Sequence, residues 1–153
     1  AIILPILDYG RRHNKFLYRI YNNLFITFTR TIEQGILSGA SWVIIGAAVT
    51  IFIFNENTAI IGLLVLSIAD SAAAIIGIKF GKTQLFSKSL EGSVAFFITA
   101  AIIVFTISPA AFYINFIAAS TATVVELLAT PRINANLLIP MVIAFILTLG
   151  GIG

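Results

Sequence analysis

The chain has 153 residues, of which 59% are hydrophobic and only 10% are charged, and its mean hydropathy is +1.08. Soluble domains carry about a quarter charged residues, so this composition excludes an ordinary soluble globule and predicts a polytopic membrane protein. The net charge is +3, and the absence of cysteine excludes a disulfide framework and a thiolate metal site.

The first 34 residues do not form a membrane span of normal length. The opening stretch, AIILPIL, is too short to cross a bilayer and lacks the positively charged start of a signal peptide. We therefore expect a longer parent protein with further N-terminal spans. Residues 9–34 mix basic and apolar residues at roughly helical spacing. This pattern predicts an amphipathic helix in the cytoplasmic interface.

Five apolar stretches follow, with boundaries set by length and charge because membrane helices tolerate glycine and proline. They cover residues 37–54, 58–80, 93–108, 109–129 and 137–152. The last is short, since about 20 residues is typical of a membrane helix. The sequence therefore predicts an all-α fold, a membrane helical bundle of five spans. Residues 1–153 would form a single integral membrane domain, with the catalytic bundle in residues 35–153.

The positive residues fall in alternate connections between these spans. Five precede the first span, three lie at or just after the end of the second span, and one lies before the last. The three in the middle, Lys79, Lys82 and Lys88, define what we call the lysine loop. By the positive-inside rule, the N-terminal segment, the lysine loop and Arg132 face the cytoplasm. We expect a protein of a bacterial-type inner membrane or an ER-like membrane, with its site on that face.

Asp70 stands inside the second predicted span. A charged residue at mid-span costs about 2.5–3.5 kcal/mol on insertion scales, and intramembrane acids are functional by default. The structural alternative is a protonated Asp70 that hydrogen-bonds a neighbouring helix. The residues after it are small, including Gly77 and Gly81, which would let helices approach closely and leave room for a ligand.

The lysine loop predicts phosphate binding but is not a P-loop. GIKFGKT, residues 77–83, has three residues between its glycines instead of four, and it follows a membrane helix instead of a strand. We expect Lys82 and Lys88 to bind phosphate, because they flank a loop that also supplies Ser89 and Gly92. Lys79 fits a phosphate ligand and a topological anchor equally well.

Two further acids approach the same predicted membrane face as Asp70. Glu91 begins the third span, where it could simply stabilise the helix dipole. Glu126 lies near the end of an otherwise uncharged span. Carboxylates beside lysines are typical of sites that hold Mg²⁺ together with phosphates. We therefore predict Asp70, Glu91 and Glu126 as metal ligands.

Three stretches of this sequence resemble the motifs of a known protein family. ADSAAAIIGIKFGKTQLFSKSLEGS, residues 69–93, resembles the signature of the CTP-dependent lipid-alcohol kinases, which include dolichol kinase, phytol kinase and the CTP-dependent diacylglycerol kinases. EQGILSGASWVIIG and VELLATPRINANLLIP are similar to two flanking elements and add Glu33, Gly39 and Asn136 as site candidates. The chain departs from the family where acidic residues usually precede Asn136, and it lacks an earlier Arg-Lys and His element.

The resemblance implies a membrane kinase that transfers a phosphoryl group from CTP, with Mg²⁺, to a polyprenol, another isoprenoid alcohol or diacylglycerol. Its partners would be the lipid, the nucleotide and the bilayer, not nucleic acid, and an oligomer remains open. On this interpretation Asp70, Glu91 and Lys88 are catalytic. The nucleotide would be bound by Lys79, Lys82, Lys88, Ser89, Gly77, Gly81 and Gly92.

Two other functions remain open on the sequence. A cytidylyltransferase that joins CTP to a lipid phosphate would use the same groups, and its release of pyrophosphate would distinguish it from a kinase. An ion-coupled transporter could use Asp70 as its ion site. That interpretation predicts inverted repeats and broken helices, which the sequence does not display, and it leaves the lysine loop unexplained.

Overall fold

The computed structural model describes residues 3–10, 14, 16, 19, 38–130 and 134–152. The chain divides into two compact units, residues 1–45 and residues 46–153. Glu33 and most of the predicted interfacial helix, residues 9–34, lie outside the described residues, as does Arg132.

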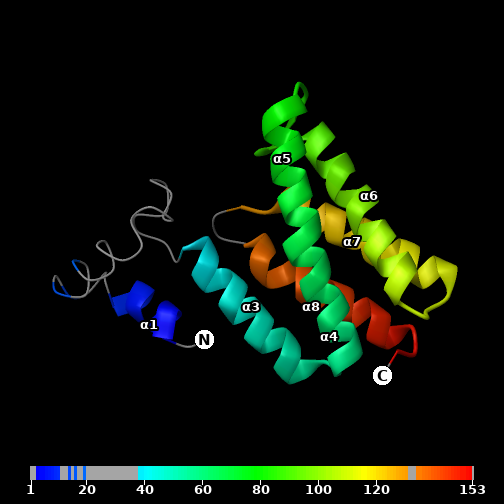
Figure 1. Cartoon of the computed structure of the whole chain (residues 1–153), viewed down its shortest axis with the longest axis horizontal. Helices are drawn as coiled ribbons and strands as arrows, with labels where there is room; N and C mark the ends of the chain where they lie inside the picture. The colour runs from blue at the N-terminus through cyan, green and yellow to red at the C-terminus, as the bar shows by residue number, and fades with distance from the viewer. Residues whose placement is uncertain are drawn as a thin grey trace. The chain divides into compact units, whose positions relative to one another are not determined.

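The described part of the chain is mostly helical, as predicted (Figure 1). Its α-helices are α1 (Ile3–Gly10), α3 (Gly39–Ile53), α4 (Glu56–Leu64), α5 (Asp70–Phe80), α6 (Leu90–Ile107), α7 (Phe112–Leu128) and α8 (Ala135–Leu149). A π-helix, η3 (Val65–Ala69), joins α4 to α5, so that Glu56–Phe80 is one continuous helix. Two short strands, β1 (Gln84–Leu85) and β2 (Lys88–Ser89), pair between α5 and α6.

Two helices in the described residues are long and apolar enough to cross a membrane. They are Glu56–Phe80, with 25 residues, and Leu90–Ile107, with 18 residues. The other three predicted spans coincide with α3, α7 and α8, which are apolar but have only 15, 17 and 15 residues. A 15-residue helix is about 22 Å long, shorter than the hydrocarbon core of about 30 Å. Five spans therefore remain a prediction.

The second unit packs its helices closely through small residues. Within it α5 lies beside α6, α6 beside α7, and α8 beside both α7 and α4 (Figure 1). Ala100, Ala118 and Ala122 are fully buried between the helices, and small side chains let helix backbones approach. A Cβ at Gly62 would lie 2.5 Å from the carbonyl oxygen of Pro140. This position of α4 therefore requires glycine for its contact with α8.

Large apolar side chains cover much of the outer surface of the described helices. Phe52 is 92% exposed and Ile78 is 86% exposed, and Phe112 and Leu149 also point outward. Soluble monomers rarely expose large contiguous apolar patches. The surface pattern therefore agrees with the membrane environment that the composition predicts.

In the first unit, a buried carboxylate holds the start of α3. Asp8 Oδ2 accepts a hydrogen bond of 2.6 Å from the Ser38 N–H group and another of 2.6 Å from Ser41 Oγ. All three residues are buried. A negative charge is favourable at a helix N-terminus, where backbone N–H groups lack intrahelical acceptors. The contact joins residues 30 and 33 positions apart in the sequence, and the sequence pattern did not reveal it.

Candidate functional site

The second part of the lysine loop folds as a two-stranded ribbon, β1 and β2, which lies between α5 and α6. Gln84 pairs with Ser89, and Leu85 pairs with Lys88, so Phe86 and Ser87 form a two-residue turn. Phe86 has a φ of +56°, a conformation that bulky residues seldom adopt. The sequence predicted a loop here, and the structure adds that Lys88 lies in a strand, paired with Leu85.

Three glycines predicted to line a nucleotide instead surround Ser89. A Cβ at Gly77, Gly81 or Gly92 would lie 2.9, 3.0 or 2.9 Å, respectively, from Ser89 Oγ. Ser89 caps α6, because its Oγ accepts a hydrogen bond of 3.1 Å from the Gly92 N–H group. A side chain at these glycines would disturb the α5–α6 contact, which gives all three a packing role. Nucleotide binding by these four residues remains a prediction.

Lys88 and Glu126 form an ion pair that also engages Ser93. The Lys88 Nζ atom lies 2.6 Å from Glu126 Oε1, and Ser93 Oγ donates a hydrogen bond of 3.2 Å to Glu126 Oε2. The Glu126 side chain is 1% exposed, whereas that of Lys88 is 36% exposed. A buried carboxylate is costly without a charged partner and hydrogen bonds, and this carboxylate has both. The site prediction did not include Ser93, although it ends the SKSLEGS motif.

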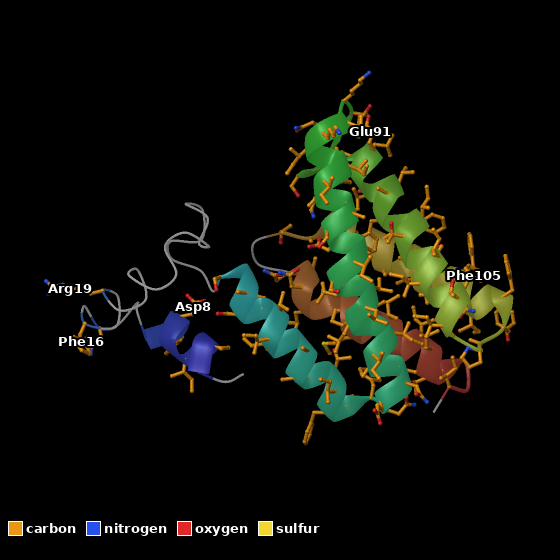
Figure 2. The ribbon with its side chains drawn as sticks, in the orientation of Figure 1. Asp8, Phe16, Arg19, Glu91 and Phe105 are labelled. Carbon is orange, nitrogen blue, oxygen red and sulfur yellow. The ribbon has the colours of Figure 1, made fainter. Side chains whose placement is uncertain are left out.

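Glu91 is engaged by the backbone at the start of the ribbon. Its carboxylate accepts the Thr83 N–H group, at 3.2 Å from Oε1 and 3.3 Å from Oε2. Glu91 also lies in the first turn of α6, where a negative charge stabilises the helix dipole. Figure 2 shows it at the end of α6 that lies beside the end of α5. The structure therefore gives Glu91 a structural role, and its catalytic role remains a prediction.

The two other lysines of the lysine loop, Lys79 and Lys82, are exposed. Lys79 lies in the last turn of α5, where a positive charge is favourable, and its Nζ atom is 5.3 Å from the centre of the Phe80 ring. Lys82 lies in the connection between α5 and β1. Both lysines precede the ribbon by only a few residues in the sequence. Phosphate binding by either of them remains a prediction.

Asp70 begins α5 directly after the π-helix η3 and is half-buried. Ala73, three residues after Asp70, packs against the start of α6, because a Cβ at Gly92 would lie 2.9 Å from the Ala73 carbonyl oxygen. Asp70 lies about 4.5 Å from Ala73 along the helix axis, in the direction away from the ribbon. Short π-helices occur frequently at functional sites. The apolar pattern of the sequence did not reveal this one.

The described residues do not form a ready-made magnesium site. They contain no group of three or more His, Cys, Asp and Glu side chains arranged to hold a metal. Glu126 is engaged by Lys88 and Ser93, and Glu91 by Thr83. The described structure therefore does not gather the three predicted ligands, Asp70, Glu91 and Glu126, into a metal site. Binding of Mg²⁺ remains a prediction.

The additional candidates are only partly placed. Gly39 begins α3. Asn136 lies in the first turn of α8, where its N–H group donates a hydrogen bond of 3.0 Å to the Asn134 side chain. Both residues remain candidates.

Comparison with known proteins identifies relatives over most of the chain. It is 33% identical to the uncharacterized protein RP860 of Rickettsia prowazekii over 144 residues, which cover 88% of this chain and 71% of that protein. It is 32% identical to the uncharacterized protein MJ1137 of Methanocaldococcus jannaschii over 136 residues, 87% of this chain and 69% of that protein. No family model and no solved structure matches the chain.

A third relative carries a functional name. CTP-dependent diacylglycerol kinase 1 of Saccharomyces cerevisiae is 35% identical over 99 residues, which cover 63% of this chain. The match covers only 34% of the kinase, so about two thirds of that protein has no counterpart in the match. This is a distant homology.

Proposed function

We propose that this chain, which belongs to the same protein family as RP860 and MJ1137, is a membrane lipid kinase. The observation that carries the proposal is the distant homology to CTP-dependent diacylglycerol kinase 1. The substrate would be a lipid alcohol, namely diacylglycerol, a polyprenol or another isoprenoid alcohol, and the phosphoryl donor would be CTP.

The described geometry offers groups suited to this reaction. Phosphoryl transfer depends mainly on positioning and on neutralising phosphate charge. Lys88 holds an ammonium group at the ribbon, and its side chain is partly exposed. The ribbon lies between the ends of two helices that are long and apolar enough to cross a membrane. A water-soluble nucleotide and a lipid hydroxyl group can meet at such a boundary.

The proposed step is a direct transfer. The lipid hydroxyl oxygen attacks the γ-phosphorus of CTP, the bond from that phosphorus to the β-phosphate bridging oxygen breaks, and CDP leaves. Asp70 accepts the hydroxyl proton, while Lys88 and Lys82 neutralise the phosphates. The products are CDP and a lipid phosphate. We further propose that the lysine loop faces the cytoplasm, where CTP is available.

The test uses the purified protein in lipid nanodiscs with CTP, Mg²⁺ and a panel of lipid alcohols. We expect phosphorylated lipid and CDP in equal amounts for at least one alcohol. Pyrophosphate in place of CDP, with a lipid phosphate as the required acceptor, would identify a cytidylyltransferase and contradict the proposal. No turnover with any acceptor, in protein shown to be folded, would also contradict it.

A further inference from the structure

We infer that Glu126 is a positioning residue for Lys88 and not a metal ligand, and that Ser93 in turn fixes Glu126. This inference rests on the proposed function, because it assigns Lys88 to the phosphates of CTP. It replaces the metal role that the sequence suggested for Glu126.

Both carboxylate oxygens of Glu126 are already engaged. Oε1 lies 2.6 Å from Lys88 Nζ, and Oε2 accepts the Ser93 hydroxyl at 3.2 Å. The Glu126 side chain is 1% exposed. A hydrated cation that bound this carboxylate would therefore have to enter the protein interior and displace Lys88 or Ser93. Mg²⁺ gives up its water reluctantly, so it usually keeps several water ligands and is bound through one or two carboxylates together with substrate phosphates. The arrangement suits the pairing of a carboxylate with an ammonium group better than metal coordination.

Lys88 keeps the capacity to bind a phosphate while it is paired. An ammonium group has three N–H donors and no acceptor, and Glu126 Oε1 needs only one of them. The Lys88 side chain is 36% exposed, so the remaining donors can reach a ligand from the solvent side. Protein kinases use the same chemistry, with a phosphate-binding lysine held by a glutamate from a helix.

A second contact fixes the ribbon to the same end of α7. Ser87 Oγ donates a hydrogen bond of 3.4 Å to the carbonyl oxygen of Ala129, the residue after α7 ends. Neighbouring residues of the ribbon, Ser87 and Lys88, thus both contact α7 or its cap. The position of the Lys88 ammonium group is therefore set by α7 and α6 together, through Glu126 and Ser93.

The test compares Glu126→Gln and Ser93→Ala with two controls, Glu56→Gln and Ser108→Ala. Glu56 is an exposed carboxylate at the opposite end of the Glu56–Phe80 helix, and Ser108 is a buried serine at the far end of α6. Equilibrium binding of CTP is measured with and without Mg²⁺, and the Mg²⁺ concentration for half-maximal activity is measured at saturating CTP.

We expect Glu126→Gln to weaken CTP binding by about tenfold, both with and without Mg²⁺, and Ser93→Ala by about threefold. The half-maximal Mg²⁺ concentration should not change in either variant. Adding Glu126→Gln to Lys88→Ala should weaken binding no further, since Glu126 acts through Lys88. The two controls should bind CTP like the wild type.

Two results would overturn the inference. One is wild-type CTP affinity in Glu126→Gln, and the other is a raised Mg²⁺ requirement in a variant that still binds metal-free CTP normally. If Glu126→Gln does not fold, Ser93→Ala decides alone, because it keeps both charges. Wild-type protein that binds no CTP would instead contradict the proposed function. In that case the amine reactivity of Lys88, measured by mass spectrometry, would show whether the ion pair exists.

Discussion

The two ends of α6, which lie near Glu91 and Phe105 in Figure 2, are stabilised by different chemistry, although most residues between them are apolar. At the ribbon end, charged side chains dominate: Lys88 pairs with Glu126, and Glu91 binds a backbone N–H group. At the far end, Ser108 Oγ accepts the Ala110 N–H group at 3.2 Å, and the Phe105 and Phe112 rings pack with centroids 5.0 Å apart.

This difference indicates what the charges are for. The far end of α6 is completed by neutral groups, and Asn115 there supports the turn by donating to the Ala110 carbonyl oxygen at 3.2 Å. A helix end in this protein therefore does not require ionised side chains. Ionised groups near apolar helices are costly, so their concentration at the ribbon favours a function in binding or catalysis.

The largest expected effect is at Asp70. Asp70→Asn should reduce CDP formation by about 100-fold or more, because it removes the proposed proton acceptor. Expression, membrane insertion and the thermal unfolding temperature should remain near those of the wild type. Turnover at the wild-type rate would make Asp70 structural and remove it from the site.

The next effect separates the two lysines of the ribbon region. Lys88→Ala should weaken CTP binding by about tenfold and destabilise the fold by about 1–3 kcal/mol, because it leaves the Glu126 carboxylate buried without its ion partner. Lys82→Ala should weaken binding less and leave stability unchanged. Both losses should shrink at high salt, which screens ionic contacts. Equal CTP affinity in wild type and both variants would remove both lysines from the proposed nucleotide site.

A smaller effect compares glycines at the two ends of the described bundle. Gly92→Ala should lower the free energy of unfolding by about 1–3 kcal/mol, since the added Cβ would lie 2.9 Å from a backbone oxygen of Ala73. Gly151→Ala should cost about 1 kcal/mol, because nothing lies within 4 Å and only its φ of +87° is unfavourable. Denaturant unfolding of both variants measures the difference. A larger cost at Gly151 would contradict the close packing around Ser89.

The last prediction concerns membrane orientation. The chain has no cysteine, so Asn57→Cys, Thr83→Cys and Asn134→Cys each introduce a single thiol. A membrane-impermeant thiol reagent added outside intact cells should label position 57 and spare positions 83 and 134, as the positive-inside rule predicts. Labelling at position 83 from outside would place the ribbon away from cytoplasmic CTP.

The sequence predicted the helices better than it predicted their contacts. Long apolar runs between charged connections located α3, the Glu56–Phe80 helix, α6, α7 and α8, because hydrophobic length is a property of the local sequence. The π-helix before Asp70 and the ribbon register were not predicted, since both depend on how neighbouring helices fit together.

In the candidate site, too, the sequence identified residues but not the contacts between them. Lys88 and Glu126 were each selected as functional, from the motif and from an unexplained charge. Their pairing, 38 residues apart in the sequence, is a tertiary contact that no local pattern encodes. Ser93 could have been found from its place at the end of SKSLEGS. The glycines were predicted as ligand positions, and only the packing around Ser89 revealed their structural role.

The most direct test of the central claim follows each phosphate of CTP separately. Purified protein in nanodiscs would receive diacylglycerol or a polyprenol, with CTP labelled at either the γ- or the α-phosphate. The account predicts that the γ-label enters the lipid and the α-label remains in CDP, and that Asp70→Asn reduces the transfer by about 100-fold or more. Incorporation of the α-label into lipid, or no transfer of either label by folded protein, would contradict it.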